Sequence, residues 1–208
     1  MKYKIIIAFI VIISGSKSVK AQIDSTDTEK KWIIDLGGSI GLFIPFHQPK
    51  GESMIIGTTT NTSIQFNYEK HYFARLEFGE ISADFRDKRM INGINSKINS
   101  NTNSLNIALG LGYQYRIGKW QPFIYGGGGP SYVSVPEMNY DEGSNTASYR
   151  TKTSVNGQLN LGTGVNYYLS KSIMLLLETK ASSVLNLPKQ PNANLSGISA
   201  LVNVKIAL

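Results

Sequence analysis

Apolar and polar residues alternate along seven stretches of the chain, and an eighth such stretch closes it. In the clearest stretch, the fourth, the two faces are Leu105, Ile107, Leu109, Leu111, Tyr113 and Tyr115 against Asn106, Ala108, Gly110, Gly112, Gln114 and Arg116. A period of two residues is typical of a β-strand whose faces meet different surroundings. We therefore predict strands at residues 32–44, 64–69, 72–79, 105–116, 120–133, 155–169, 173–180 and 198–208.

The connections between these strands switch regularly between short and long. Short ones lie at Glu69–His71, Gly118–Lys119 and Ser170–Ser172, and long polar ones lie near residues 45–57, 86–103, 134–153 and 186–196. Tight turns at one end and long loops at the other are typical of an antiparallel up-and-down barrel.

The two strand faces also differ in composition, since one is apolar and the other is rich in amides and glycine. In a soluble barrel the apolar side chains would fill the interior, and asparagine and glycine, which are depleted in strands, would cover the outside. In a transmembrane barrel the apolar face meets lipid, and small polar residues suit a narrow lumen. We favour the second arrangement, so the predicted fold class is all-β, an eight-stranded antiparallel transmembrane up-and-down β-barrel.

The first 21 residues have the three parts of a secretory signal peptide. Lys2 and Lys4 precede an apolar run at residues 5–13, and Val19 and Ala21 stand three and one before the expected cleavage. That run is too short for a transmembrane helix, which needs about 20 residues. We expect a signal peptide at 1–21, a short periplasmic segment at 22–31 and an outer-membrane barrel at 32–208. Insertion from the periplasm would leave the short turns and both termini on that side.

The charge of the chain argues against nucleic acid as a partner. The formal net charge is +7, but the leader contributes four basic and no acidic residues, which leaves 17 basic against 14 acidic groups. The resulting charge of about +3 is small and scattered. The chain has no cysteine, which excludes disulfides, thiol catalysis, thiolate metal sites and a lipid-modified cysteine.

Aromatic residues gather at the strand ends beside the short turns. Amphipathic rings at such positions are typical of the interfacial girdle of a membrane barrel. The predicted periplasmic girdle consists of Trp32, Tyr68, Tyr72, Tyr113, Tyr115, Trp120 and Tyr167.

Charged residues also occur on the face that is expected to line the lumen. They are Asp35, Arg75, Glu77, Arg116, Glu178, Lys180 and Lys205. Four positive and three negative groups in a narrow lumen are expected to pair, because an unpaired buried charge is costly. The favoured interpretation is a structural network that closes the barrel, and a conducting path is the alternative.

No catalytic, cofactor-binding or metal-binding set is predicted. The run Gly126–Gly129 lacks the Lys-Ser/Thr and the helix of a phosphate-binding loop. We expect it to bend the wall or to let a bulky neighbour cross the lumen, with Pro130 ending regular pairing. The two histidines, His47 and His71, are expected at opposite ends of the barrel and cannot share a metal or a triad.

Two long loops carry charged candidates for recognition. Arg86, Lys88 and Arg89 offer contacts to lipopolysaccharide phosphates, and Asp141 and Glu142 offer oxygen ligands of the kind that calcium accepts. The acidic spacing departs from an EF-hand loop. Simple solvated loops are the favoured interpretation of both segments.

Several segments resemble the small outer-membrane β-barrels of the OmpA and OmpX type, and PorT-like barrel families in particular. The resemblance spans Trp32 to Leu208, and its most typical segments are LNIALGLGYQYR (105–116), QPFIYGGGGPSY (121–132), LGTGVNYY (161–168) and the ending VKIAL (204–208). In these families the final strand acts as the signal that the barrel assembly machinery recognises. The resemblance therefore implies that this machinery is a partner during insertion. Here the last residue is Leu208 rather than the commoner phenylalanine.

The resemblance implies an integral, porin-like protein of the cell outer membrane, but such barrels serve as anchors, adhesins, enzymes and secretion components. We expect a non-enzymatic anchor with recognition loops, in contact with outer-membrane lipid, lipopolysaccharide and surface or envelope proteins. The alternative is a transport or secretion component, either a small pore or a PorT-like accessory of protein export. A lipid-modifying enzyme at the outer leaflet is the third hypothesis.

Overall fold

The computed structural model describes residues 32–46, 52–54, 56–91, 94–141, 146–185 and 195–208. Its strands are β1 (Trp32–Pro45), β2 (Glu52–Met54), β3 (Gly57–Tyr68), β4 (Tyr72–Ile91), β5 (Ile94–Gln114), β6 (Trp120–Asp141), β7 (Thr146–Tyr168), β8 (Ile173–Leu185) and β9 (Gly197–Ala207). All but β2 correspond to predicted strands, and β2 pairs with the outer part of β4. In the part of the chain that the structure describes, no helix is long and apolar enough to cross a membrane.

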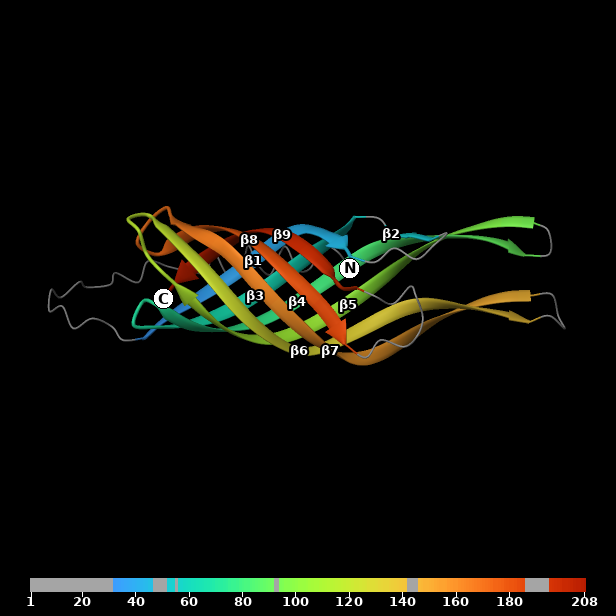
Figure 1. Ribbon diagram of the computed structural model, residues 1–208, viewed down its shortest axis with the longest axis horizontal. Coiled ribbons are helices and arrows are strands. Elements are labelled where there is room, and N and C mark those ends of the chain that lie inside the picture. The colour runs from blue at the N-terminus through green and yellow to red at the C-terminus, as the bar shows by residue number, and fades with distance from the viewer. Residues whose placement is uncertain (1–31, 47–51, 55, 92–93, 142–145, 186–194) are drawn as a thin grey trace, which may run out of the picture.

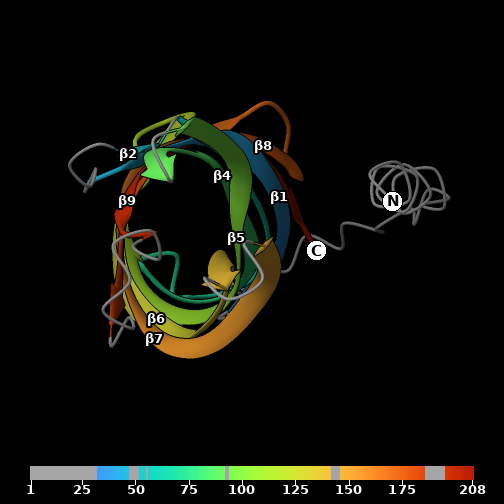
Figure 2. The same ribbon diagram turned by 90° about the vertical axis from the view of Figure 1, so that its right-hand side faces the viewer.

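Eight antiparallel strands close into a barrel. They pair in the order β4-β3-β1-β9-β8-β7-β6-β5, and β4 also pairs with β5, which joins the two edges. Figure 2 shows this ring along its axis. Closure pairs the backbone groups of the wall along both sides of each strand, which is what a lipid environment requires. The predicted fold class is confirmed.

The three short turns lie together at one end of the barrel, where the chain also ends (Figure 1). Tyr68 accepts a 3.2 Å backbone hydrogen bond from His71 N, which closes the turn between β3 and β4. Its two central residues, Glu69 and Lys70, have positive φ angles of 49° and 64°. The turn between β5 and β6 reaches the same left-handed region at Gly118, whose φ is 62°. We call this the short-turn end.

The outer surface of the barrel is apolar. On β5 the outward positions from Leu105 to Tyr113 are all apolar or aromatic, and the next two toward the opposite end are Asn103 and Asn101. At ~3.3 Å per residue and a tilt of roughly 40°, the stretch from Leu105 to Tyr113 covers about 20 Å along the barrel axis. This height fits within the apolar band of about 25 Å that outer-membrane barrels present to lipid.

Two of the segments that we predicted as long loops are strands. Residues 86–91 and 94–103 form the outer parts of β4 and β5, and residues 134–141 and 146–153 form the outer parts of β6 and β7. Figure 1 shows both pairs as long hairpins that extend beyond the barrel, away from the short-turn end. The prediction was wrong because it relied on the alternation of apolar and polar residues. Lipid requires this alternation in a strand inside the membrane, but a strand that lies in water outside the membrane does not need it.

The run Gly126–Gly129 lies inside β6, where it lets the neighbouring strand approach closely. A Cβ atom on Gly127 would lie only 2.5 Å from the Cα atom of Gly110 on β5. Pro130, which has no N–H, stands where the ladder between β5 and β6 is interrupted. Regular pairing does not end there as predicted, because pairing with β5 resumes at Ser131 and pairing with β7 continues to Asp141.

Candidate functional site in the barrel lumen

Ion pairs cross the lumen between opposite walls. Arg75 Nη1 on β4 lies 3.3 Å from Glu77 Oε1 on the same strand and 3.0 Å from Glu178 Oε2 on β8. Lys180 Nζ on β8 lies 3.2 Å from Glu77 Oε2. Strands β4 and β8 are diametrically opposed in the ring, so these contacts join the two sides of the barrel. We call Arg75, Glu77, Glu178 and Lys180 the charge cluster.

Tyr125 joins a third wall to the charge cluster. Its hydroxyl, carried by β6, lies 2.5 Å from Glu178 Oε1 and 3.1 Å from Glu77 Oε1. All four carboxylate oxygens of the two glutamates therefore have a donor. Buried charges are tolerated when they are paired and hydrogen-bonded in this way, so the cluster suits a structural role.

Aromatic rings surround the Arg75 guanidinium. Its Cζ atom lies 4.5 Å from the ring centroid of Tyr125 and 5.2 Å from those of Phe73 and Phe123. A cation over a ring face is attracted by the ring quadrupole, most strongly when it is shielded from water. Glycines on neighbouring strands make room for these rings at Gly112, Gly162 and Gly164.

An amide network lies between the charge cluster and the short-turn end. Gln65 Oε1 accepts hydrogen bonds from Arg75 Nε at 3.0 Å and from Lys205 Nζ at 2.9 Å. Gln65 Nε2 donates to Asn67 Oδ1 at 2.7 Å, and Asn67 Nδ2 donates to Asp35 Oδ2 at 2.9 Å. The carboxylate of Asp35 and the ammonium of Lys205 are thus linked through amides.

A cluster of buried apolar side chains lies in the lumen near the hairpins. It consists of Phe43, Ile81, Ala83, Val133, Val135, Val184 and Leu195. We call this the outer apolar cluster. Buried hydroxyl groups, among them Thr102 and Ser104, lie beside it. An ion entering from the hairpin end would meet this cluster first and then the charge cluster, and both oppose conduction.

The structure places six of the seven predicted lumen charges inside the barrel. Asp35, Arg75, Glu77, Glu178, Lys180 and Lys205 are buried. The assignment of Arg116 was wrong, because β5 ends at Gln114 and Arg116 lies exposed in the turn that follows. There its Nε donates to Gly118 O at 3.1 Å, and its guanidinium lies 4.0 Å from the ring centroid of Tyr168.

The predicted girdle residues lie at the short-turn end, and most of them form ring pairs. Ring centroids are 4.8 Å apart for Trp32 and Tyr68, 4.6 Å for Trp120 and Tyr167, and 5.6 Å for Tyr72 and Tyr113. The seventh ring, Tyr115, stacks on His71 at 5.9 Å. Their role at a membrane interface stays a prediction.

The candidate recognition residues lie on the hairpins or outside the described residues. Arg86, Lys88 and Arg89 belong to the outer part of β4, and Asp141 is the last residue of β6. Glu142 and His47 lie outside the described residues. Within the described ranges, no three His, Cys, Asp or Glu residues are grouped so that they would hold a metal ion.

The aromatic residues that β6 contributes to the lumen were not predicted. Tyr125 and Phe123 point inward beside Phe73 and are buried, although the inner face was expected to be amide- and glycine-rich. The signal was present in the inward glycines, because Gly162 and Gly164 on β7 stand beside Tyr125 and Phe123 on β6. Recognising it required the register of β6, which the glycine run obscured.

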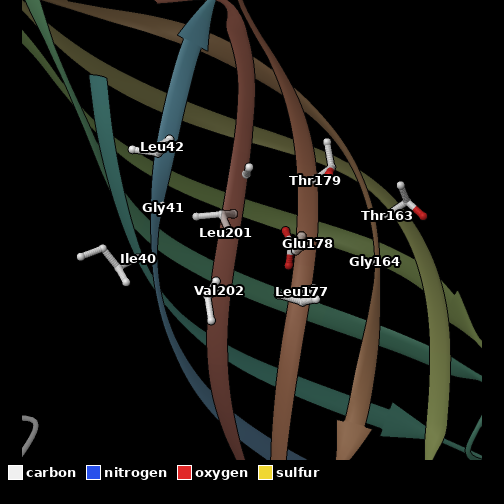
Figure 3. Close-up of a pocket in the computed structure, with 11 residues that line it drawn as sticks. Ile40, Gly41, Leu42, Thr163, Gly164, Leu177, Glu178, Thr179, Leu201 and Val202 are labelled. Carbon is white, nitrogen blue, oxygen red and sulfur yellow. The ribbon is translucent and has the colours of Figure 1, made fainter. Parts of the chain in front are cut away.

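A shallow hollow on the outer wall is the surface feature shown in Figure 3. It crosses β1, β9, β8 and β7, and its exposed lining includes Ile40, Leu42, Leu177 and Val202. Small outward residues, Thr163 and Thr179 among them, leave the hollow between these larger side chains. Its position on the apolar outer surface suits contact with lipid.

Comparisons with known proteins agree with this geometry. A family model described as outer membrane protein beta-barrel domain matches residues 9–205. The structure of OprG from Pseudomonas aeruginosa is similar, with a TM-score of 0.52 and 14% identity over 86% of this chain and 96% of OprG. Neisserial surface protein A is similar at a TM-score of 0.50 and 9% identity, over 86% of this chain and 96% of that one.

The structure of the outer membrane enzyme PagL also matches, at a TM-score of 0.41 and 18% identity over 83% of this chain and 98% of PagL. No curated protein sequence matches the chain. One fold hosts many activities, so function has to be argued from the side chains.

Proposed function

The chain belongs to the outer membrane protein β-barrel domain family and is integral to the outer membrane, and from this premise we propose that it is a closed, non-enzymatic anchor that carries two recognition hairpins. The observation that supports this most directly is the filled lumen, where the charge cluster and the outer apolar cluster lie in series. Among the described residues, the outer parts of the two hairpins extend beyond the barrel (Figure 1). Their sequences are rich in polar residues, which suit contacts with molecules outside the membrane.

The proposal includes export and orientation. Residues 1–21 serve as a cleaved signal peptide, residues 22–31 as a short periplasmic segment, and residues 32–208 as the barrel. The short-turn end faces the periplasm with its aromatic girdle at the interface, and the hairpins face outward. Insertion would use the barrel assembly machinery.

We expect purified protein to show no stable conductance in planar lipid bilayers. The variant that combines Glu77→Ala with Phe43→Ala removes one side chain from the charge cluster and one from the outer apolar cluster. We expect this variant to conduct steadily because water can then fill the lumen. Glu80→Ala is the matched control, since Glu80 is an exposed carboxylate on the outer face of β4. Stable conductance of the unchanged protein would contradict the anchor and favour a small pore.

We expect the basic part of the β4–β5 hairpin to bind lipopolysaccharide. The triple variant Arg86→Gln, Lys88→Gln, Arg89→Gln removes three donors that suit phosphate, and charge-assisted hydrogen bonds of this kind contribute about 1.5–3 kcal/mol each. Titration of purified lipopolysaccharide into the barrel in nanodiscs should show at least about tenfold weaker binding. The control is Arg150→Gln with Lys152→Gln on the β6–β7 hairpin, and equal losses in both variants would contradict site-specific binding.

The geometry gives little support to an outer-leaflet enzyme. His71, the one histidine among the described residues, lies at the short-turn end and stacks on Tyr113 and Tyr115. Glu77 and Glu178 are buried and fully hydrogen-bonded, so neither carboxylate is available as a general base for an external substrate. A PorT-like role in protein export remains the second candidate, and contacts at the short-turn end would favour it.

A further inference from the structure

The lumen opens at the short-turn end into a pocket of about 140 Å³. Its floor is formed by buried polar side chains, namely Asp35, Asn67, Gln114 and Gln121. Its rim is formed by three exposed cations, Lys70, Arg116 and Lys171. We call this the mouth pocket. It lies outside the charge cluster, and Asp35 and Asn67 of its floor belong to the amide network.

Each of the three short turns contributes one of the rim cations. Lys70 lies in the turn between β3 and β4, Arg116 in the turn between β5 and β6, and Lys171 in the turn between β7 and β8. The pocket lining carries three positive groups and one negative group, the buried Asp35. The net positive charge favours an anionic ligand.

Arg116 is held in position for such a ligand. Its Nε atom donates to Gly118 O at 3.1 Å, and its guanidinium lies 4.0 Å from the ring centroid of Tyr168. Tyr168 is fixed in turn by a 2.9 Å hydrogen bond from its hydroxyl to Gln121 Oε1. These contacts use Nε and one face of the guanidinium. The two terminal nitrogens of Arg116 are left for a ligand, and their parallel N–H groups match the two oxygens of a carboxylate.

Lys171 supplies a second cation. Among the residues that the structure describes, it forms no ion pair. Lys70 and its neighbour Glu69 already have interactions of their own, so Arg116 and Lys171 are the cations that a ligand would contact.

The floor of the pocket is closed and already satisfied. Gln114 Nε2 donates to Asn67 Oδ1 at 2.9 Å, and Asn67 Nδ2 donates to Asp35 Oδ2 at 2.9 Å. A ligand therefore stops at the mouth and does not pass into the lumen. Ile33, Met174 and Ala207 add an apolar side to the wall, which an inorganic anion would not use.

We propose that the mouth pocket binds a carboxylate-bearing peptide segment, with Arg116 and Lys171 contacting the carboxylate and the apolar wall contacting the adjoining side chain. The orientation of this pocket toward the periplasm rests on the proposed function, but the binding itself does not depend on whether the lumen conducts. Two sources carry this chemistry. One is a separate periplasmic polypeptide, and the other is the segment of this chain before β1, whose sequence contains Asp24, Asp27 and Glu29.

The test uses the full barrel in nanodiscs and the peptide acetyl-Ala-Ala-Leu with a free carboxylate. Its C-terminal amide is the matched control ligand. We expect the peptide with the free carboxylate to bind at least about tenfold more tightly than the amide. The variants Arg116→Gln and Lys171→Gln should each lower the affinity for the free-carboxylate peptide by about tenfold. Lys119→Gln, an exposed lysine in the same turn as Arg116 that does not line the pocket, should leave binding unchanged. Slower migration after boiling would show that each variant is folded.

Deleting residues 22–29 distinguishes the two sources. Tighter binding of the peptide after deletion assigns the pocket to this chain's own segment, and unchanged binding assigns it to a separate polypeptide, so both results support a carboxylate site. Equal affinity for the acid and the amide overturns the proposal, and so does unchanged binding in both the Arg116→Gln and Lys171→Gln variants.

Discussion

Replacing Glu178 with alanine is expected to destabilise the folded barrel by about 3 kcal/mol, at the lower end of the range for breaking a buried ion pair. Glu178 accepts from Arg75 at 3.0 Å and from the hydroxyl of Tyr125 at 2.5 Å. Its loss leaves the buried guanidinium with Glu77 as its one carboxylate and removes a contact that joins opposite walls. Urea unfolding in detergent micelles, followed by the change in gel migration, measures the difference.

The matched control is Glu80→Ala, because Glu80 is an exposed carboxylate on the outer face of β4. We expect that variant to lose less than about 0.5 kcal/mol, as is usual for surface substitutions. Removing both partners with Arg75→Met and Glu178→Ala should recover part of the loss, since no unpaired guanidinium then remains in the lumen. A loss below about 1 kcal/mol in Glu178→Ala alone would show that water reaches the charge cluster and screens it.

The sequence was sufficient to predict the barrel because lipid imposes a strict rule on each strand. Residues that face hydrocarbon must be apolar, so alternation such as that from Leu105 to Gln114 identifies a strand, its length inside the membrane and its outward face together. The short turns were equally clear, because each lies between two alternating stretches. These are local signals, and each can be recognised without knowing where the other strands lie.

The lumen could be predicted only in part because its contents depend on which strands face each other. Arg75 and Glu178 are 103 positions apart, and nothing in their local sequences links them. The inward position of Arg75 follows from alternation, but its aromatic surroundings depend on the register of β6. That register was obscured by Gly126–Gly129, where side chains give no pattern.

Two errors have the same physical origin, which is the end of the membrane. Arg116 continues the alternation of β5 in the sequence, but β5 ends at Gln114. The backbone bonds beyond it, from Tyr115 and Ile117 to the start of β6, close the short turn, and the Arg116 side chain is exposed there. At the opposite end, the strands continue through residues 86–91, 94–103, 134–141 and 146–153 although the alternation stops. Alternation therefore reports where lipid lies, and hydrogen-bond pairing decides where a strand begins and ends.

Replacing Gly162 with alanine is expected to destabilise the barrel by about 2–3 kcal/mol, within the range for overpacking a filled interior. A Cβ atom at this position would lie 2.5 Å from Cζ and 2.8 Å from Oη of Tyr125, which is closer than carbon atoms normally approach. Tyr125 cannot move aside freely, because its hydroxyl is bonded to both glutamates and its ring lies against Arg75. The added methyl group must therefore displace the charge cluster or push β7 away from β6.

A double-mutant cycle with Tyr125→Ser separates this mechanism from a general effect of alanine in the strand. Once the ring is absent, the methyl group has space, so we expect the cost of Gly162→Ala to fall by about 1–3 kcal/mol in the Tyr125→Ser background. Gly126→Ala is the control for backbone effects, because its Cβ would lie 3.9 Å from the nearest atom, Asn160 O, which is ordinary contact. Equal costs of Gly162→Ala in both backgrounds would mean that the ring of Tyr125 does not fill the space beside β7. The aromatic surroundings of Arg75 would then differ from those described, and the charge cluster would lose the packing that shields it from water.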